Sequence, residues 1–236
     1  MKNRILIGNL KNQIGTATTI AGWVDTRRDH GKLIFIDLRD SSGKVQMVVL
    51  PNRKEAHSLA STVRSEWVIS VRGNVNRRPE KMINKDESNG TIEIEVLEIK
   101  VLGQAEEVPF GLGSSVTIET YLDYMPFTLR APKTRAIFKV QAVIAKTFRD
   151  FFLKEGFIEF QAPKLIGDDA EGGANAFSLD YFGHTAHLAQ SPQLYKQILV
   201  GVFERVFSVG NVYRAEKHAT TRHLNEYTSL DIEMGF

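Results

Sequence analysis

The pattern of apolar and polar residues divides the chain into a β-rich first part and a mixed second part. In the first part, short runs rich in β-branched and aromatic residues predict strands, and one polar stretch with apolar residues at helical spacing predicts a helix. The strands are expected at Thr18–Asp25, Leu33–Asp40, Lys44–Leu50, Glu66–Val75 and Thr91–Leu102, and the helix at Asn52–Arg64. This order of elements is that of an OB-fold, a small barrel that often binds nucleic acid.

The second part begins near Pro126 and has the pattern of helices alternating with strands. A long amphipathic helix is expected over Lys133–Glu155, because apolar residues recur near one of its faces. They are Ile137, Val140, Ile144, Phe148, Phe151 and Phe152. Further elements are expected at Phe157–Phe160 (extended), Gln193–Val202 (helix), Arg205–Val212 and Ser229–Met234 (strands). The expected organisation is an α+β chain with a first domain at 1–103, a linker at 104–125 and a second domain at 126–236.

One predicted strand carries a large aromatic residue on its polar face. Alternation along Leu33–Asp40 turns Ile34 and its alternate neighbours toward the core, so Phe35 points outward. Gln46 on the next strand and Arg28 before this one fall on the same side. An exposed ring with amide and guanidinium neighbours can stack on an unpaired base, read its edge and contact phosphate. The alternative is that Phe35 is covered by another part of the chain and that the charges are simply solvated.

The two parts of the chain differ in net charge. The whole sequence carries 30 basic and 28 acidic residues, a net charge of +2. Residues 1–105 have a net charge of +5 and residues 106–236 a net charge of −3, which favours a polyanionic partner for the first part. The sequence has no cysteine, which excludes disulfides, thiolate zinc sites and cysteine nucleophiles. Without a membrane-spanning apolar run or a signal-peptide pattern, a cytoplasmic protein with no membrane partner is expected.

The densest polar chemistry of the second part lies close to the end of the printed sequence. Arg214 and Glu216 are two residues apart and share a face if a strand continues through them. Arg222 and His223 return after a short loop. Two arginines and a histidine suit a triphosphate, because guanidinium groups bind phosphate in a planar fork, and Tyr227 can stack on a base. A solvated hairpin whose charges pair across its strands is the alternative.

Histidines and glycines of the second part carry weaker signals. His184 and His187 form an H-x-x-H, but the glutamate of a zinc-binding H-E-x-x-H is missing. With His218 and His223 considered as well, we expect no metal site in this chain. No glycine-rich phosphate motif of the P-loop or Rossmann type occurs. Glu171 lies in a short glycine-containing segment, which is either a plain loop or a lid over a ligand with an amino group.

These segments together resemble the class II aminoacyl-tRNA synthetases, and within that family the aspartyl branch of archaeal type. The resemblance extends over essentially the whole chain. It is carried by Gly22–Asp29, Ile34–Asp40, Phe148–Pro163, Gln190–Gln197 and Phe207–Phe236. Phe148–Pro163 resembles motif 1, used for dimerisation, and Phe207–Phe236 resembles motif 2. Gln190–Gln197 is similar to the aspartate-pocket segment and is the specific match, because lysyl and asparaginyl relatives differ there.

For the first domain the resemblance implies an OB-fold that binds the anticodon of tRNA-Asp. The anticodon-binding residues that it implies are Arg28, Phe35, Gln46, Asn84 and Glu93. Phe35 would stack on the central anticodon base, and its neighbours would read base edges. In some relatives a histidine before the second strand and a proline in a later loop accompany relaxed discrimination between tRNA-Asp and tRNA-Asn. His30 and Pro79 stand in such positions, which leaves tRNA-Asn open as a second substrate.

For the second domain the resemblance implies an aspartate–tRNA ligase that activates L-aspartate with ATP and Mg²⁺. Aspartyl-adenylate would form first and then pass its acyl group to the tRNA. The implied ATP-binding residues are Arg214, Glu216, Arg222, His223 and Tyr227, with Arg214 and Glu216 as catalytic residues. The implied aspartate-binding residues are Glu171, Ser191, Gln193, Lys196 and Asp231. A fixed arginine stabilises the negative charge that develops when a carboxylate attacks phosphate.

The resemblance also implies parts that the sequence does not contain. Motif 3, with its second ATP-binding arginine, and the magnesium ligands should follow motif 2, but the sequence stops at Phe236. We therefore expect an incomplete catalytic domain with motifs 1 and 2, a homodimer formed through motif 1, and little or no aminoacylation by this chain alone. The alternatives are a non-catalytic tRNA- or RNA-binding protein that uses only the barrel, and an asparaginyl- or lysyl-tRNA synthetase relative.

Overall fold

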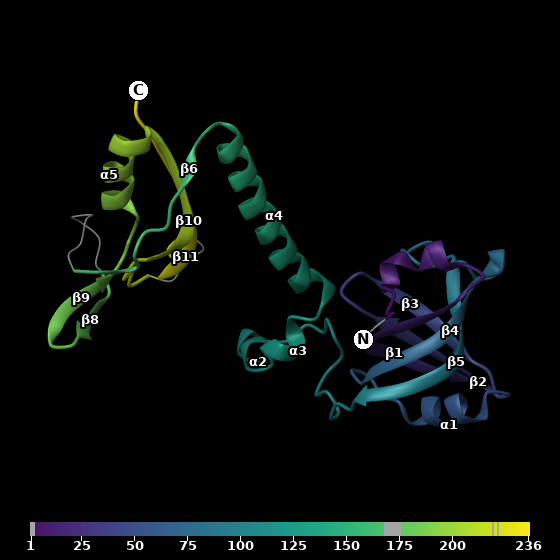
Figure 1. Cartoon of the computed structure of the whole chain (residues 1–236). Helices are drawn as coiled ribbons and strands as arrows, with labels where there is room; N and C mark the ends of the chain where they lie inside the picture. The colour runs from purple at the N-terminus through teal and green to yellow at the C-terminus, as the bar shows by residue number, and fades with distance from the viewer. Residues whose placement is uncertain (1–2, 168–175, 219, 221) are drawn as a thin grey trace. The chain divides into compact units, whose positions relative to one another are not determined.

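The computed structural model describes residues 3–167, 176–218, 220 and 222–236. The chain divides into two compact units, Met1–Gly111 and Leu112–Phe236, each of which has its own sheets and helices (Figure 1). Within the described ranges, no helix combines the length and the apolar character needed to cross a membrane.

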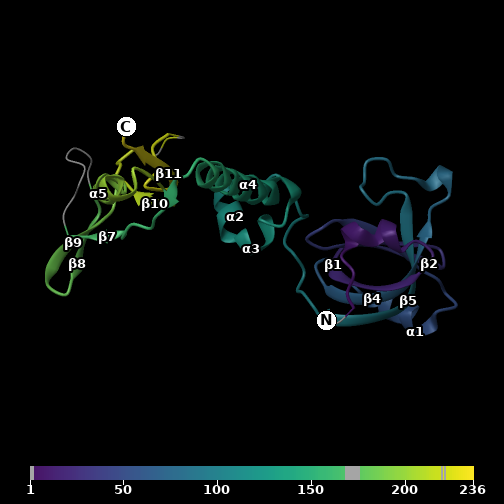
Figure 2. The same cartoon turned by 45° about the horizontal axis from the view of Figure 1, so that its top comes forward.

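The first unit is a closed barrel with the strand order β1-β2-β3-β5-β4. Its strands are β1 (Ala17–His30), β2 (Leu33–Arg39), β3 (Lys44–Val49), β4 (Val68–Arg77) and β5 (Ile92–Gly103). Neighbouring strands are antiparallel except β3 and β5, which pair in parallel and close the barrel. Two short helices, η1 (Ile7–Gln13) and α1 (Lys54–Thr62), lie at opposite ends of the barrel, and η2 (Glu80–Met82) follows β4 (Figures 1 and 2). The predicted OB-fold is confirmed.

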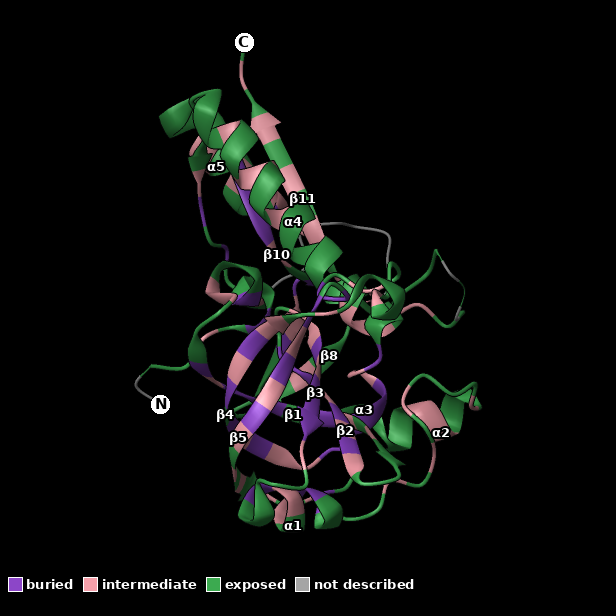
Figure 3. Ribbon diagram, turned by 90° about the vertical axis from the view of Figure 1, so that its right-hand side faces the viewer, coloured by how far each residue is buried: buried purple, intermediate pink, exposed green. Residues whose placement is uncertain are grey.

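The barrel core contains the side chains that the alternation predicts. Ile34, Ile36 and Leu38 of β2 are at most 4% exposed, whereas the residues between them are only partly buried. The same alternation of buried and half-buried residues marks several barrel strands in Figure 3. Ile7 and Leu10 of η1 are fully buried in this core, although the sequence pattern did not predict that helix. A short 3-10 turn has no 3.6-residue periodicity to detect.

The buried carboxylate of Asp40 joins the N-terminal segment to the barrel. It accepts hydrogen bonds from the backbone N–H groups of Ile7 (3.0 Å), Ser42 (2.8 Å) and Gly43 (3.1 Å), and its Oδ2 lies 3.2 Å from the guanidinium of Arg4. Burial raises the pKa of Asp40, but the hydrogen bonds from Ser42, Ile7 and Gly43 outweigh this effect and lower the pKa below its ordinary value. The folded state therefore favours the ionised carboxylate.

The second unit contains a three-stranded sheet of order β11-β10-β6 with a helix on each face. Its elements are α4 (Pro132–Lys154), β6 (Ile158–Glu159), α5 (Gln193–Phe203), β10 (Arg205–Tyr213) and β11 (Glu226–Met234). Phe148 and Phe152 of α4 pack on Phe207, with ring centroids 5.8 Å apart in both pairs. On the other face Val200 of α5 packs against Val206. Because adjacent strand residues point to opposite faces, Val206 and Phe207 hold the two helices on opposite sides.

Five elements of the second unit were not predicted from the sequence. They are α2 (Ile118–Asp123), α3 (Met125–Thr128), β7 (Leu165–Ile166), β8 (Ser178–Tyr181) and β9 (His184–Leu188). The three strands form a separate sheet of order β7-β9-β8, and α2 lies in the segment 104–125 that was expected to be a linker. Elements of two to six residues are too short to establish a periodicity.

The predicted apolar face of the long helix is only partly buried. Phe148 and Phe152 contact the sheet, as expected for a core-facing stripe. In contrast, Ile137, Val140 and Ile144 are 52–61% exposed in this chain. The periodicity correctly predicted an apolar stripe, but it contains no information about what covers that stripe.

Candidate functional site

An open groove of about 650 Å³ lies on the outside of the barrel. Its lining residues are Arg28, His30, Leu33, Phe35, Gln46, Val48, Arg78, Met82 and Glu93. Strands β1, β2, β3 and β5 all contribute, because cross-strand pairing aligns Arg28 with Phe35 and Phe35 with Val48. The groove therefore brings together most of the residues predicted for the first domain: Arg28, His30, Phe35, Gln46 and Glu93.

Phe35 forms an aromatic surface within this groove. Its side chain is half-buried, whereas the flanking Ile34 and Ile36 are in the core, so the predicted outward orientation is confirmed. The ring of His30 packs against it with centroids 6.0 Å apart and an interplanar angle of 84°. This edge-to-face contact restrains the phenyl ring, so that a stacking partner meets a preorganised surface.

Two arginines of the groove are held by carboxylates. Arg28 donates to Asp37 at 2.9 Å, and its side chain remains 52% exposed. The side chain of Arg78 is only 9% exposed, and its Nε lies 3.9 Å from Oε2 of Glu93. That Nε has no hydrogen-bond partner among the described residues. A guanidinium has five donors in a fixed fork, so both arginines retain N–H groups that can bind a base edge or a phosphate.

Sequence reasoning missed Arg78 and Met82, which also line the groove. Arg78 directly follows β4, and the adjacent pair Arg77-Arg78 at a strand end was a usable signal for a nucleic-acid contact. Met82 is 65% exposed, which is unusual for a large apolar side chain. Its position could not be predicted, because it depends on the local turn: the carbonyl of Pro79 accepts a hydrogen bond from the Met82 N–H at 2.8 Å.

Two residues predicted for the first domain lie outside the lining of the groove. Asn84 shapes the loop between β4 and β5: its Oδ1 accepts from the Asp86 N–H at 3.0 Å, and its own N–H donates to Gly90 at 3.1 Å. Pro79 precedes η2 and acts on the groove only through the turn that places Met82. Asn84 and Pro79 therefore do not line the groove, and they contribute to it through the loop and the turn that they shape.

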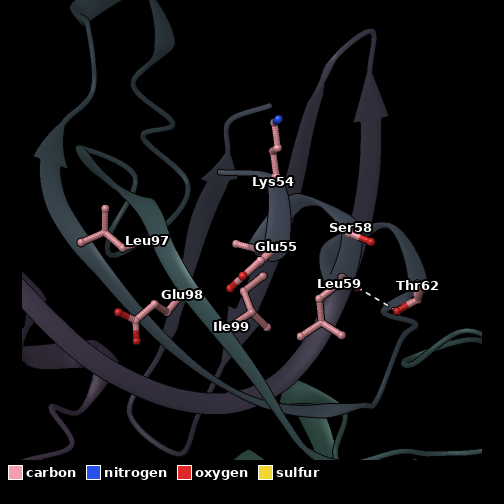
Figure 4. Close-up of a pocket in the computed structure, with 9 residues that line it drawn as sticks. Lys54, Glu55, Ser58, Leu59, Thr62, Leu97, Glu98 and Ile99 are labelled. Atoms are coloured by element: carbon pink, nitrogen blue, oxygen red, sulfur yellow. Dashed lines mark hydrogen bonds between the residues drawn. The ribbon is translucent and has the colours of Figure 1, made fainter. Parts of the chain in front are cut away.

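A second open groove, of about 820 Å³, lies between α1 and β5 (Figure 4). Its lining residues are Lys54, Glu55, Ala56, Ser58, Leu59, Thr62, Leu97, Glu98 and Ile99. None of the predicted site residues belongs to this set. Its lining contains two carboxylates, Glu55 and Glu98, and a single ammonium group, that of Lys54, which disfavours a polyanion. The groove that contains Phe35 is therefore the better candidate for nucleic acid.

In the second unit, a lysine of α5 lies between two carboxylates of β11. Nζ of Lys196 is 3.5 Å from Oδ1 of Asp231 and 3.5 Å from Oε2 of Glu233. The side chains of Lys196 and Asp231 are 14% and 18% exposed, so this contact is largely shielded from water. Ser191 and Gln193 lie at the start of the same helix, where the Ser191 hydroxyl oxygen accepts from the Gln193 N–H at 3.2 Å. Lys196 and Asp231, both predicted for the aspartate pocket, are thus brought together.

The loop that joins β10 and β11 is closed by Asn225, a residue to which the sequence reasoning gave no role. The N–H of Arg214 donates to the Asn225 carbonyl at 2.9 Å, and the Asn225 side chain donates to the carbonyls of Arg214 (3.0 Å) and Glu216 (3.1 Å). These bonds hold Arg214 beside Tyr227, with the guanidinium carbon 6.0 Å from the ring centroid. A cation and an aromatic face so placed suit a phosphate and a planar base.

The remaining predicted residues lie further along this loop or outside the described residues. Arg222 and His223 are exposed, and the His223 ring nitrogen Nδ1 is 2.8 Å from the hydroxyl of Thr220. Glu171 is outside the described residues. In the part of the chain that the structure covers, no group of three or more His, Cys, Asp or Glu side chains is arranged to hold a metal ion.

Comparison with known proteins identifies both units. Residues 18–102 match the OB-fold nucleic acid binding domains, which agrees with the barrel and its groove. The first unit is thus of a nucleic-acid-binding class. Residues 117–236 match the tRNA synthetases class II (D, K and N). Because this match spans just over half of the chain, the chain belongs to the class II tRNA synthetase family.

Similar proteins include aspartate–tRNA(Asp/Asn) ligases and a solved structure of an asparaginyl-tRNA synthetase. An aspartate–tRNA(Asp/Asn) ligase of Deinococcus radiodurans is 45% identical over 99% of this chain and 51% of its own length. One of Archaeoglobus fulgidus is 41% identical over 99% of this chain and 54% of its own length. A crystal structure of asparaginyl-tRNA synthetase from Pyrococcus horikoshii, complexed with asparaginyl-adenylate, has a TM-score of 0.89 at 33% identity over 99% of this chain and 53% of that one. The chain thus spans about half the length of the curated relatives it matches.

Proposed function

We propose that this chain is the tRNA-reading domain and a part of the catalytic domain of an aspartate–tRNA ligase. The observation that carries the proposal is the groove in which Phe35, Gln46 and two carboxylate-held arginines converge. The reaction would form aspartyl-adenylate from L-aspartate and ATP, with Mg²⁺ neutralising phosphate charge, and would then acylate tRNA-Asp. The similarity to aspartate–tRNA(Asp/Asn) ligases supports this assignment.

In the groove, the functional group of each side chain would determine how it contacts the anticodon. The restrained ring of Phe35 would stack on the central anticodon base, and the Gln46 amide would read its edge. Arg28 and Arg78 would donate to base acceptors or to the phosphate backbone, and Glu93 would accept from an exocyclic amine. Asn84 would act indirectly, by fixing the loop beside the groove.

We further propose that the enzyme accepts both tRNA-Asp and tRNA-Asn. The anticodons of these tRNAs differ only in the third base, so acceptance of both requires a site that does not discriminate at that position. His30 contacts Phe35, and Pro79 starts the turn that brings the thioether of Met82 into the groove. A thioether is a weak acceptor and no donor, which suits a tolerant subsite. Charging of both tRNAs by the complete enzyme tests this; strict inactivity on tRNA-Asn would refute it.

In the second unit, Lys196 would pair with the side-chain carboxylate of the substrate, and Asp231 would hold its ammonium group. Ser191, Gln193 and Glu171 would complete the amino-acid pocket. Arg214 would bridge the reacting carboxylate and the α-phosphate of ATP, stabilising the charge that develops there. Tyr227 would stack on adenine, Glu216 would contact the adenine side, and Arg222 and His223 would hold the γ-phosphate.

We also propose a homodimer formed through the motif 1 segment. Within this segment, Phe148–Pro163, the side chains of Phe151, Leu153 and Ile158 are 46–55% exposed. The preceding turns of α4 also expose Ile137, Val140 and Ile144, each by more than half. Contiguous exposed apolar surface is typical of a protein–protein interface. Analytical ultracentrifugation measures the association directly.

Binding of tRNA by the purified chain tests the core of this proposal. We expect the chain to bind a tRNA-Asp transcript, with weaker binding when the central anticodon base is changed and with affinity that falls as salt rises. Equal affinity for both transcripts would refute anticodon reading. In the same preparation, ATP–pyrophosphate exchange with aspartate should be nearly absent, because the chain spans only about half of its relatives. Exchange at the rate of a complete synthetase would contradict that expectation.

An asparagine–tRNA ligase is the second candidate, because solved structures of asparaginyl-tRNA synthetases resemble the chain with TM-scores of up to 0.89. The shielded ammonium of Lys196 favours an anionic side chain over a neutral amide. Calorimetric titration of the chain with L-aspartate and with L-asparagine separates the two candidates.

A further inference from the structure

Lys164, to which no role has been given above, lies on the same face of the sheet as Lys196 and Asp231. Its backbone carbonyl accepts a hydrogen bond from the Ala189 N–H at 2.9 Å, which places the residue beside the segment that leads into α5. Its side chain is half-buried and reaches over Gly210 of β10. Within the described ranges, the ammonium group has no direct hydrogen-bond or ion-pair partner.

Gly210 provides the space for this side chain. A Cβ atom at residue 210 would lie 3.1 Å from Nζ and 3.4 Å from Cε of Lys164, closer than ordinary van der Waals contact. Gly210 pairs with Ser229, and Ser208 pairs with Asp231, so the side chains of Ser229 and Asp231 emerge on the face that Lys164 covers. The Ser229 hydroxyl donates to Asp231. The lysine ammonium therefore lies over the backbone of Gly210, which has no side chain, on the face of the sheet that carries Asp231.

Attraction to Asp231 and burial act on Lys164 in opposite directions. Burial lowers the pKa of the Lys164 ammonium, and the charge of Asp231 opposes this effect without cancelling it. The two groups therefore interact electrostatically, although they are not in direct contact.

Besides Arg214, which lies beside Tyr227 after the end of β10, this face carries two ammonium groups and two carboxylates near Asp231. Lys196 and Lys164 contribute two positive charges, and Asp231 and Glu233 contribute two negative charges. The contacts of Lys196 with its carboxylates, at 3.5 Å each, are longer than the roughly 2.7–2.9 Å of strong charge-assisted hydrogen bonds. Lys196 can therefore exchange them for a substrate carboxylate. When it does, Lys164 remains on this face as a second positive charge that interacts with Asp231.

We propose that Lys164, seated on Gly210, supplies a second positive charge to this face and is a residue that makes the amino-acid pocket select an anionic side chain. The inference rests on the proposed amino-acid pocket. Without Lys164 the face would lose one positive charge and would attract the side-chain carboxylate of L-aspartate less strongly. A neutral amide would be affected much less, since the attraction acts on charge.

Calorimetric titration of the whole chain with L-aspartate and L-asparagine tests the proposal, using wild type, Lys164→Met and Gly210→Ala. Lys164→Met should weaken L-aspartate binding about tenfold, equivalent to about 1.4 kcal/mol, and leave L-asparagine affinity nearly unchanged. Gly210→Ala should act in the same direction, because it displaces the ammonium while retaining the charge. Lys139→Met is the matched control, since Lys139 is exposed on α4.

The outcomes distinguish this inference from the proposed function. If wild type binds neither amino acid, the proposed amino-acid pocket fails and the inference falls with it. If wild type binds L-aspartate and Lys164→Met binds it equally well, only the role of Lys164 is refuted. Equal weakening of both ligands by Lys164→Met would indicate a structural role and would also overturn the proposal. Should Lys164→Met fail to fold, as judged by circular dichroism, the Gly210→Ala result decides.

Discussion

Replacement of Phe35 by alanine should remove tRNA binding without destabilising the barrel. The ring lines the groove and is held at its edge by His30, so its loss removes a stacking surface rather than a core contact. Stacking of a base on an aromatic side chain contributes about 1–3 kcal/mol, which corresponds to roughly a 5- to 150-fold loss of affinity. Phe35→Trp should retain most of the affinity, because a larger ring offers the same kind of surface.

The adjacent residue provides a matched control. Ile36 is fully buried on the other face of β2. Ile36→Ala should cost about 2–5 kcal/mol of unfolding free energy, through lost burial and a cavity. At low denaturant, where the variant remains folded, its tRNA affinity should be close to that of wild type.

Fluorescence anisotropy with a labelled tRNA-Asp transcript at one fixed salt concentration measures the affinities, and urea unfolding measures the stabilities. The reasoning would be refuted if Phe35→Ala changed affinity by less than about twofold, because a stacking surface should contribute about 1 kcal/mol or more. It would equally be refuted if Phe35→Ala destabilised the barrel as much as Ile36→Ala, because Phe35 would then be a core residue.

Three further substitutions test the packing. Asp40→Asn should cost about 1.5–3 kcal/mol at neutral pH. Because the pKa of Asp40 is lowered in the folded state, the wild-type advantage is present above the unfolded-state pKa and is lost as the pH falls through the folded-state value. Thermal melts of both proteins at several pH values should therefore converge in acid, and a constant difference would contradict the assignment. Gly73→Ala should destabilise by about 1–3 kcal/mol, because its Cβ would lie 2.5 Å from the Glu95 carbonyl oxygen, whereas Gly103→Ala, with open space around it, should be nearly neutral in urea unfolding. Phe207→Ala should cost about 3–5 kcal/mol and lower only the unfolding transition of the second unit; a shift of the barrel transition as well would show that the two units unfold together.

Much of the barrel could be predicted because its strands obey a simple alternation. Ile34 and Phe35 are neighbours in sequence, and the polarity of their surroundings assigned them to opposite faces correctly. The same reasoning could not detect η1 or the short strands of the second unit, because a few residues carry no periodicity. It predicted the apolar stripe of α4 but not the exposure of Ile137 and Val140, because an apolar stripe does not specify its partner.

The candidate site was predictable where it depends on strand register and unpredictable where it depends on turns. Gln46 and Glu93 reach the groove because their strands are paired, and the alternation already placed them outward. Met82 reaches it through a hydrogen bond of Pro79, which the sequence pattern does not reveal. Lys164 reaches over Gly210 on the face that carries Asp231, an arrangement of distant residues that no local motif contains.

The parallel pairing of β3 with β5 has a consequence for how the groove that contains Phe35 is formed during folding. Met47 pairs with Ile94 and Val48 with Glu95, so barrel closure joins segments that are far apart in sequence. Barrels with many such non-local contacts fold in about milliseconds to seconds, since the intervening chain must lose entropy before these contacts form. Because Glu93 lies beside the closing pair and Arg28 on the first strand, a partly folded barrel has no complete groove. Recovery of tRNA binding during refolding would therefore report barrel closure itself, later than any signal from the local hairpin of β2 and β3.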